Sequence, residues 1–441
     1  MTFNGSTPSG DPVTTTESVA QRENFERRLL VASIVGPGLN FASAPLLASA
    51  LGTSGRGTVA AVVSAFFILR FLATFGGQEA ALTAAGWPEL GIAGAARAAV
   101  RWIFPISVLV AVVSIVAAPL MFPQDAEAVS IFRVVALMIP LAAVTDGQRF
   151  AITADRRWKP IVAHIVLPRV VRFFGALVMV LAAITSPLVG VWVSVAGIAL
   201  GAAVILKTVR SVPGDQNVAP DVERRFRRFA ATLGPGQMAR LGNRRLDQIL
   251  LGAAAGSSEL GIYAVAVALA EVADLPTRSI RQLAMRSSNG EDGPGFDAYF
   301  RAGLLLFIPA AIGLGLVIPV VLWLLFPPEF MAALWPAEIL LVAGLANFVR
   351  DVLGAFLVND LSARLESVIQ VSTLVVGAAA VLLFGSAFGA LGAAVAALVS
   401  YSFGAILVLV KYRRAHPEVG LRGLVPRGSD ISVARAMVVS R

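Results

Sequence analysis

The chain has 441 residues, of which 57% are hydrophobic and 14% charged, and its mean hydropathy is +0.79. These values exclude an ordinary soluble protein, and the absence of cysteine excludes disulfides, thiolate metal sites and a cysteine nucleophile. The net charge of +9 would suit a nucleic-acid partner, but basic residues also collect in the cytoplasmic loops of membrane proteins, so their distribution has to decide.

Hydrophobic segments recur along the whole chain, each close to the ~20 residues that a helix needs to cross a bilayer. They predict an all-α polytopic membrane protein with about twelve transmembrane helices. Residues 1–28 are rich in Ser, Thr, Gly and charge, which predicts a disordered tail. The predicted spans are 29–51, 58–78, 102–122, 129–150, 163–184, 187–206, 229–252, 259–280, 302–325, 336–357, 366–385 and 388–410.

Basic residues lie almost entirely on one side of this arrangement. Most of the 36 Lys and Arg fall in the two tails and in alternate loops, whereas the opposite loops together hold only Arg56. The bias predicts that both termini are cytoplasmic. It accounts for most of the positive charge, so it favours a lipid bilayer with anionic head groups as partner and not a nucleic acid.

The two halves of the chain align at an offset of 204 residues. Gly57 matches Gly261, and Phe-Pro at 104–105 matches Ile-Pro at 308–309. Six spans in each half give both halves the same orientation, which is typical of transporters with parallel repeats. The sequence therefore predicts two six-helix lobes around a central cavity, with these boundaries: a lobe at 29–206, a basic cytoplasmic linker at 207–228, a lobe at 229–410 and a basic cytoplasmic tail at 411–441.

The seventh predicted span carries Arg240, Arg244 and Asp247 at a spacing that puts them on one helix face, with Arg245 turned away. A charge at the bilayer centre costs ~2.5–3.5 kcal/mol on insertion scales, so such residues face a partner or a wet cavity. Guanidinium suits phosphate because it donates a planar pair of hydrogen bonds. We predict that these arginines bind an anionic substrate; the alternative is an internal ion pair between Arg244 and Asp247.

Other spans add candidates for the same cavity. Arg70 is expected near mid-depth and has no acidic residue within four positions, so it is predicted to bind substrate. Arg133 either binds substrate or reaches the outer surface, and Asp146 is expected to pair with Arg149. Residues predicted to line the cavity or couple transport, with a structural ion pair as the alternative, are Asp247, Glu271, Asp274, Arg350 and Asp351.

The sequence lacks the residue patterns that metal binding, nucleotide binding and catalysis require. His164 and His416 have no second ligand at a metal-binding spacing, and no GxxxxGK[ST] motif is present for a nucleotide, so no metal and no cofactor is predicted. The predicted outer loops are short and contain no histidine, which leaves little room for a catalytic site. An enzyme such as a membrane polysaccharide polymerase or ligase is therefore disfavoured.

Two stretches resemble a known family. LLASALGTSGRG (46–57) resembles its first span, Gly-rich turn and next span, and RRLDQILLG (244–252) followed by ELGIYAVAVALAE (259–271) resembles its Arg-x-Asp…Gly-x-Tyr pattern. The family is the polysaccharide transporter branch of the multidrug/oligosaccharidyl-lipid/polysaccharide exporter superfamily. The resemblance implies a flippase that moves polyprenyl-pyrophosphate-linked oligosaccharide across the membrane by alternating access. The implied partners are the lipid-linked anionic glycan and glycosyltransferases or a polymerase of the same pathway.

Two alternatives come from the same superfamily. A multidrug exporter is expected to hold cationic drugs with acidic residues, yet the first two spans contain no Asp or Glu. A lipid II flippase is expected to have more than twelve spans.

Overall fold

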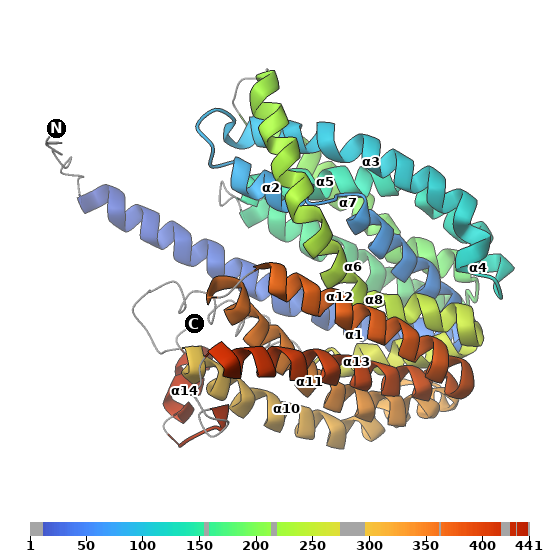
Figure 1. The fold of residues 1–441 in the computed structure, drawn as a ribbon. Coiled ribbons are helices and arrows are strands. Elements are labelled where there is room, and N and C mark those ends of the chain that lie inside the picture. The colour runs from blue at the N-terminus through green and yellow to red at the C-terminus, as the bar shows by residue number, and fades with distance from the viewer. Residues whose placement is uncertain are drawn as a thin grey trace, which may run out of the picture.

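The computed structural model describes residues 12–153, 158–212, 218–273, 296–360, 363–415, 424–428 and 430–439. This part of the chain is helical and contains no strand (Figure 1). A 3-10 turn (Pro328–Ala333) and a π-helical turn (Val381–Gly385) accompany the α-helices. These are α1 (Pro12–Leu72), α2 (Gly77–Ala84), α3 (Gly91–Met121), α4 (Ala126–Ala136), α5 (Ile139–Thr153), α6 (Trp158–Leu181), α7 (Pro187–Arg210), α8 (Pro220–Ala270), α10 (Phe296–Leu325), α11 (Leu334–Asp360), α12 (Ala363–Ala380), α13 (Ser386–Ala415) and α14 (Asp430–Val439).

The predicted spans fall on these helices, which confirms the all-α polytopic fold. Eight helical segments of the described chain are long and apolar enough to cross a membrane, and a ninth forms if α4 and α5, bent by 51°, count as one span. Two of the eight, 38–72 and 368–415, each contain two predicted spans. Exposed apolar side chains cover the outside of the bundle, such as Leu120 on α3 and Leu316 on α10, as contact with lipid requires.

Two glycines mark the structural repeat. Gly52 interrupts α1 with φ 65° and ψ −173°, and Gly256 interrupts α8 with φ 85° and ψ 176°. Glycine adopts a positive φ at little cost because it has no Cβ. Each long helix is therefore two antiparallel spans joined by a tight turn. We call the end of the bundle with these turns the glycine-turn end, and the end with the start of α1 and with α14 the tail end (Figure 1).

Helix boundaries differ from the sequence prediction at both tails and at the linker. α1 begins at Pro12, inside the stretch expected to be disordered, because residues 16–30 are mostly good helix formers. α8 begins at Pro220, inside the predicted linker; proline at the first helical position and acidic residues in the first turn favour a helix start. The predicted basic C-terminal tail includes the end of α13 and all of α14.

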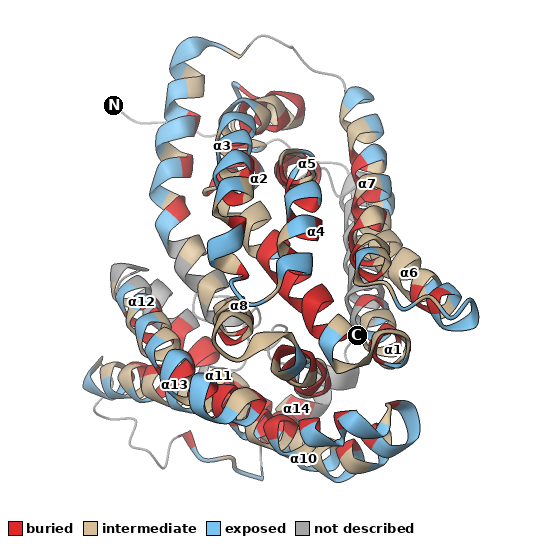
Figure 2. Ribbon diagram, turned by 90° about the vertical axis from the view of Figure 1, so that its right-hand side faces the viewer, coloured by how far each residue is buried: buried red, intermediate tan, exposed pale blue. Residues whose placement is uncertain are grey.

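The first turns of α8 pack on the first half of the chain. The Phe229 and Trp87 rings lie 6.0 Å apart, and Arg101 Nη1 donates to Glu223 Oε2 at 2.8 Å. Burial by itself would raise the pKa of Glu223, but hydrogen bonds from Arg101 and Arg227 hold it below its ordinary value. α8 is therefore the element that joins the two halves, and Figure 2, viewed from the glycine-turn end, shows it between them.

The docking of α14 is predicted to weaken in acid. Arg301 donates from Nε and Nη2 to the Asp430 carboxylate at 2.8 and 3.2 Å, and these bonds lower the pKa of Asp430. A lowered pKa stabilises the docked helix above the unfolded value of about 4, and this stabilisation is lost as pH falls through the folded value. Protection of the α14 amides against hydrogen exchange, relative to the intrinsic rate at each pH, should be high at pH 7 and low near pH 3. In Asp430→Asn, α14 should exchange fast already at pH 7; slow exchange in that variant would contradict the prediction.

Candidate functional site

The two halves touch at the glycine-turn end through small residues. A Cβ on Gly57 would lie 1.5 Å from the Ser257 carbonyl oxygen, and a Cβ on Gly261 would lie 2.0 Å from that of Thr53. The Ser54 and Ser257 hydroxyls are 3.3 Å apart. The contact is reciprocal across the repeat, so α1 and α8 meet here backbone against backbone.

Contacts between the same two helices continue toward the tail end. The Ser64 hydroxyl donates to Gln248 Oε1 in the buried interior. Beyond the end of α1, a Cβ on Gly76 would lie 2.0 Å from the Ala230 carbonyl oxygen, and the Phe75 ring covers Gly234. The two halves therefore touch at both ends of this pair of helices and between them.

Four polar side chains of the first half form what we call the basic cluster: Arg70 from α1, Asp146 and Arg149 from α5, and His164 from α6. Arg70 donates to Asp146 Oδ2 from Nε at 2.6 Å, and its Nη2 lies 2.5 Å from the same oxygen. Arg149 Nε lies 3.9 Å and His164 Nε2 3.3 Å from Asp146 Oδ1. Two guanidinium groups thus share one carboxylate, which leaves the cluster with excess positive charge.

An unsatisfied donor makes the basic cluster suited to an additional anion. Arg149 Nε is buried and has no hydrogen-bond partner within the described chain. His164 Nδ1 is also buried without a partner, and it is a donor only in the tautomer or charge state that carries a proton there. A buried donor without a partner is unfavourable. Phosphate oxygens would supply acceptors to Arg149 without displacing Asp146 from Arg70.

The environment of Arg70 differs from the prediction in two respects. It has an acidic partner, Asp146, which the search within four positions could not find because 76 residues separate them. It also lies in the last turn of α1, which ends at Leu72. Measured from the Gly52 turn, Arg70 is eighteen residues or ~27 Å along the helix, so it lies toward the tail end of the bundle.

Two arginines that the predicted site did not contain lie between α6 and α1. Arg172 Nη1 donates to Asn40 Oδ1 at 2.8 Å, and Arg169 lies against Gly36, where a Cβ would be 3.0 Å from Arg169 Cδ. Both contacts join α6 to the Gly-Pro-Gly segment of α1. Together with Arg149 and His164 they were missed because no local pattern shows that α5 and α6 face α1.

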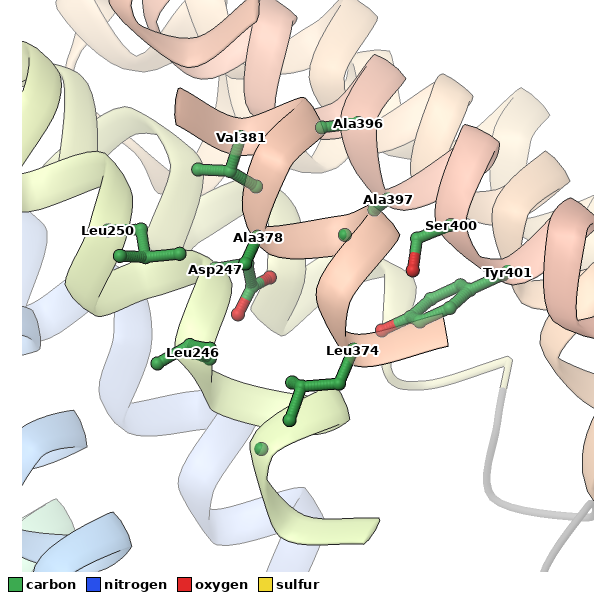
Figure 3. A pocket seen from close by; sticks show the side chains of 12 residues that line it. Leu246, Asp247, Leu250, Leu374, Ala378, Val381, Ala396, Ala397, Ser400 and Tyr401 are labelled. Atoms are coloured by element: carbon green, nitrogen blue, oxygen red, sulfur yellow. The ribbon is translucent and has the colours of Figure 1, made fainter. Parts of the chain in front are cut away.

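The second half holds Asp247 in the wall of a cavity of about 30 Å³ between α8, α12 and α13, with room for about two water molecules. The Tyr263 hydroxyl donates to Asp247 Oδ2 at 2.6 Å. Ser400 and Tyr401 line the same space, and Figure 3 shows the Asp247 carboxylate and the Tyr401 ring directed into it. This cavity lies within the second half, so the predicted place of Asp247 in a cavity between the halves stays a prediction.

Two other predicted residues form a local structural unit. Arg350 is buried and donates from Nη2 to Asn347 Oδ1 at 2.6 Å and to Asp351 Oδ1 at 3.2 Å. Its guanidinium also lies 5.0 Å from the centre of the Tyr401 ring. The pairing of Arg350 with Asp351 is the structural alternative that the sequence left open.

The remaining predicted residues are either exposed or outside the described part of the chain. Arg133 is exposed on α4, and Glu271 is exposed directly after α8. Asp274 lies outside the described residues, as do the side chains of Arg240, Arg244 and Arg245; their roles stay predictions. In the described ranges, no group of three His, Asp or Glu is placed to hold a metal ion.

Long helices in two repeated halves, which meet through two broken helices and enclose guanidinium groups, define a membrane transporter architecture. A family model described as "Polysaccharide biosynthesis protein" matches residues 28–284, more than half of the chain. The chain therefore belongs to the polysaccharide biosynthesis protein family, and its membership of the MOP (multidrug/oligosaccharidyl-lipid/polysaccharide) superfamily is confirmed. No curated protein sequence matches it.

Solved structures with a similar fold belong to the same superfamily. The lipid II flippase MurJ in an inward closed conformation superposes with a TM-score of 0.71 at 12% identity, over 94% of this chain and 90% of that one. An inward-facing multidrug resistance MATE family transporter superposes with a TM-score of 0.65 at 12% identity, over 88% of this chain and 98% of that one. A third similar structure is a MOP superfamily transporter from Pyrococcus furiosus, described as having a binding pocket of reverse polarity. It superposes with a TM-score of 0.60 at 11% identity, over 88% of this chain and 94% of that one. At sequence identities this low, the superpositions establish that the chain shares the fold of these transporters.

Proposed function

We propose that the protein is a flippase that moves a polyprenyl-pyrophosphate-linked oligosaccharide across the bacterial cytoplasmic membrane for the assembly of a cell-surface polysaccharide. The observation that carries the proposal is the basic cluster, in which two guanidinium groups face one carboxylate within a transmembrane bundle. Such a site attracts a phosphorylated head group and disfavours a cation. The polysaccharide biosynthesis family supports the same substrate class.

The proposed mechanism is alternating access between the two halves. With both termini in the cytoplasm, the tail end faces inward, and the head group enters when Gly76 separates from Ala230. The arginines of the cavity bind the pyrophosphate while the lipid tail stays in the bilayer. We propose Arg133, Arg240, Arg244 and Arg245 as further substrate ligands, and Asp247, Glu271, Asp274, Arg350 and Asp351 as residues that line the cavity or couple transport.

A multidrug exporter is the runner-up, because Asp247 lines a cavity of the second half and an acidic group could hold a cationic drug. The MATE transporter with the same fold shows that the architecture occurs in that class. A lipid II flippase is the second alternative, since MurJ has the same fold. Arg70 and Arg149 favour the anionic glycan lipid over the drug.

Transport assays in proteoliposomes test the proposal. The wild-type protein should flip a fluorescent polyprenyl-pyrophosphate glycan and should not transport a quaternary ammonium drug. Arg70→Ala and Arg240→Ala should each lower glycan flipping about tenfold or more, since each removes a charge-assisted hydrogen bond to phosphate. Arg227→Ala, an exposed arginine at the start of α8, is the control and should transport normally. Drug transport without glycan flipping would overturn the proposal.

A further inference from the structure

One face of the second segment of α1 carries an arginine at each end. Arg56, Ala60, Val63, Phe67 and Arg70 follow one another at steps of four and three residues, the spacing that keeps side chains on one side of a helix. Arg56 and Arg70 are fourteen residues apart, or ~21 Å along the axis. Arg70 belongs to the basic cluster near the tail end, and Arg56 lies near the glycine-turn end.

The two arginines differ in their partners. Arg70 is paired with Asp146. Arg56 is buried, with 5% of its surface exposed, and its Nε has no hydrogen-bond partner. In the described ranges, no carboxylate forms an ion pair with it. An uncompensated buried charge is unfavourable for folding, so it points to a ligand that is present during function.

Arg56 lies beside the contact between the two halves at the glycine-turn end. The sequence placed Arg56 in a loop, but it lies in α1 directly before Gly57, whose backbone contacts Ser257 of the other half. Arg56 is therefore next in the chain to a contact that breaks when the halves separate at this end. Ala60 and Val63, the buried residues between the two arginines, offer no polar group that would hold an anion on the way.

We propose that Arg56 is a second anion-binding residue, which takes the phosphate groups of the substrate from the basic cluster when the glycine-turn end opens. The inference rests on the proposed function and assigns a step to it: loading at Arg70 and Arg149, then passage along one helix face to Arg56. The ligand chemistry is a phosphate group, held by a guanidinium through paired hydrogen bonds.

Arg56→Met tests the proposal, because methionine is unbranched, flexible and apolar. Removal of an unpaired buried charge should leave the thermal midpoint equal or higher, so a loss of transport would not reflect unfolding. Glycan flipping in proteoliposomes should fall about tenfold or more, with Arg56→Lys between Arg56→Met and wild type. Arg227→Met is the matched control. Normal flipping by Arg56→Met would overturn the proposal.

Two further measurements distinguish a role of Arg56 after loading from a role in loading or in phospholipid binding. Because Arg56 acts after loading, Arg56→Met should lower kcat with little change in KM, whereas Arg70→Ala should raise KM; a raised KM with unchanged kcat in Arg56→Met contradicts the order of steps. The assay is repeated in vesicles without phosphatidylglycerol. If Arg56 serves a phospholipid head group, wild-type flipping drops there to the level of the variant, and the proposal fails.

The outcome also distinguishes this proposal from the one on which it rests. A wild-type protein that flips no polyprenyl-pyrophosphate glycan removes the proposed function as a whole. A wild-type protein that flips the glycan, together with an equally active Arg56→Met, removes only the role of Arg56.

Discussion

A disulfide between cysteines at positions 54 and 257 is expected to abolish transport, and a reducing agent is expected to restore it. The Ser54 and Ser257 hydroxyl oxygens lie 3.3 Å apart on α1 and α8, so the sulfur atoms of the Ser54→Cys/Ser257→Cys variant start within reach of each other. The bond would hold the glycine-turn end closed, and alternating access requires this end to open. The native chain has no cysteine that would interfere.

The measurement is glycan flipping before and after reduction, beside the extent of cross-linking on a gel. Ser54→Cys and Ser257→Cys alone are the controls, and both should transport normally with or without oxidant. Full transport by the cross-linked protein would show that the halves do not separate at this end.

Gly57→Leu should act on the same contact in the opposite direction. A Cβ at this position would overlap the Ser257 carbonyl, so the halves cannot approach and the 54–257 cross-link should form slowly or not at all. Gly313→Leu on α10 is the matched control, because a Cβ there has no neighbour within 4 Å. Equal cross-linking in the two leucine variants would contradict the close approach.

Asp146→Ala is expected to have the largest effect on stability, with a loss of about 3–5 kcal/mol in the free energy of unfolding. It leaves Arg70 and Arg149, both partly buried, together without their shared carboxylate. Glu89→Ala is the control. It breaks an exposed pair with Arg225 and should cost about 0–1 kcal/mol.

A double variant separates stability from function at the same site. Arg70→Met/Asp146→Leu removes both charges of the pair, so it should recover most of the stability lost in Asp146→Ala. If Arg70 binds substrate, glycan flipping should stay low in this stable double variant. Recovery of transport along with stability would mean that the pair is only structural, and the role of Arg70 in the proposed function would be wrong.

The basic cluster shows where sequence reasoning succeeds and where it stops. Arg70 could be selected from the sequence because a charge within an apolar segment is conspicuous. Its partner could not, because Asp146 lies on another helix and helical spacing relates only neighbours within about one turn. Arg56 shows the reverse error: its place beside a Gly-rich turn indicated a loop, whereas the turn takes only Gly52 and leaves Arg56 buried in the helix.

The sequence by itself determined the all-α polytopic class of the fold and pointed to its repeat, because the thickness of the bilayer and the need to satisfy every backbone group leave few arrangements for long apolar segments. It also located the Gly57 and Gly261 match, since close backbone contacts require residues without a side chain. Only the tertiary structure decided which charges meet. Ion pairs such as that of Arg70 and Asp146 depend on how helices distant in the chain pack side by side, and the pattern within one helix does not contain that information.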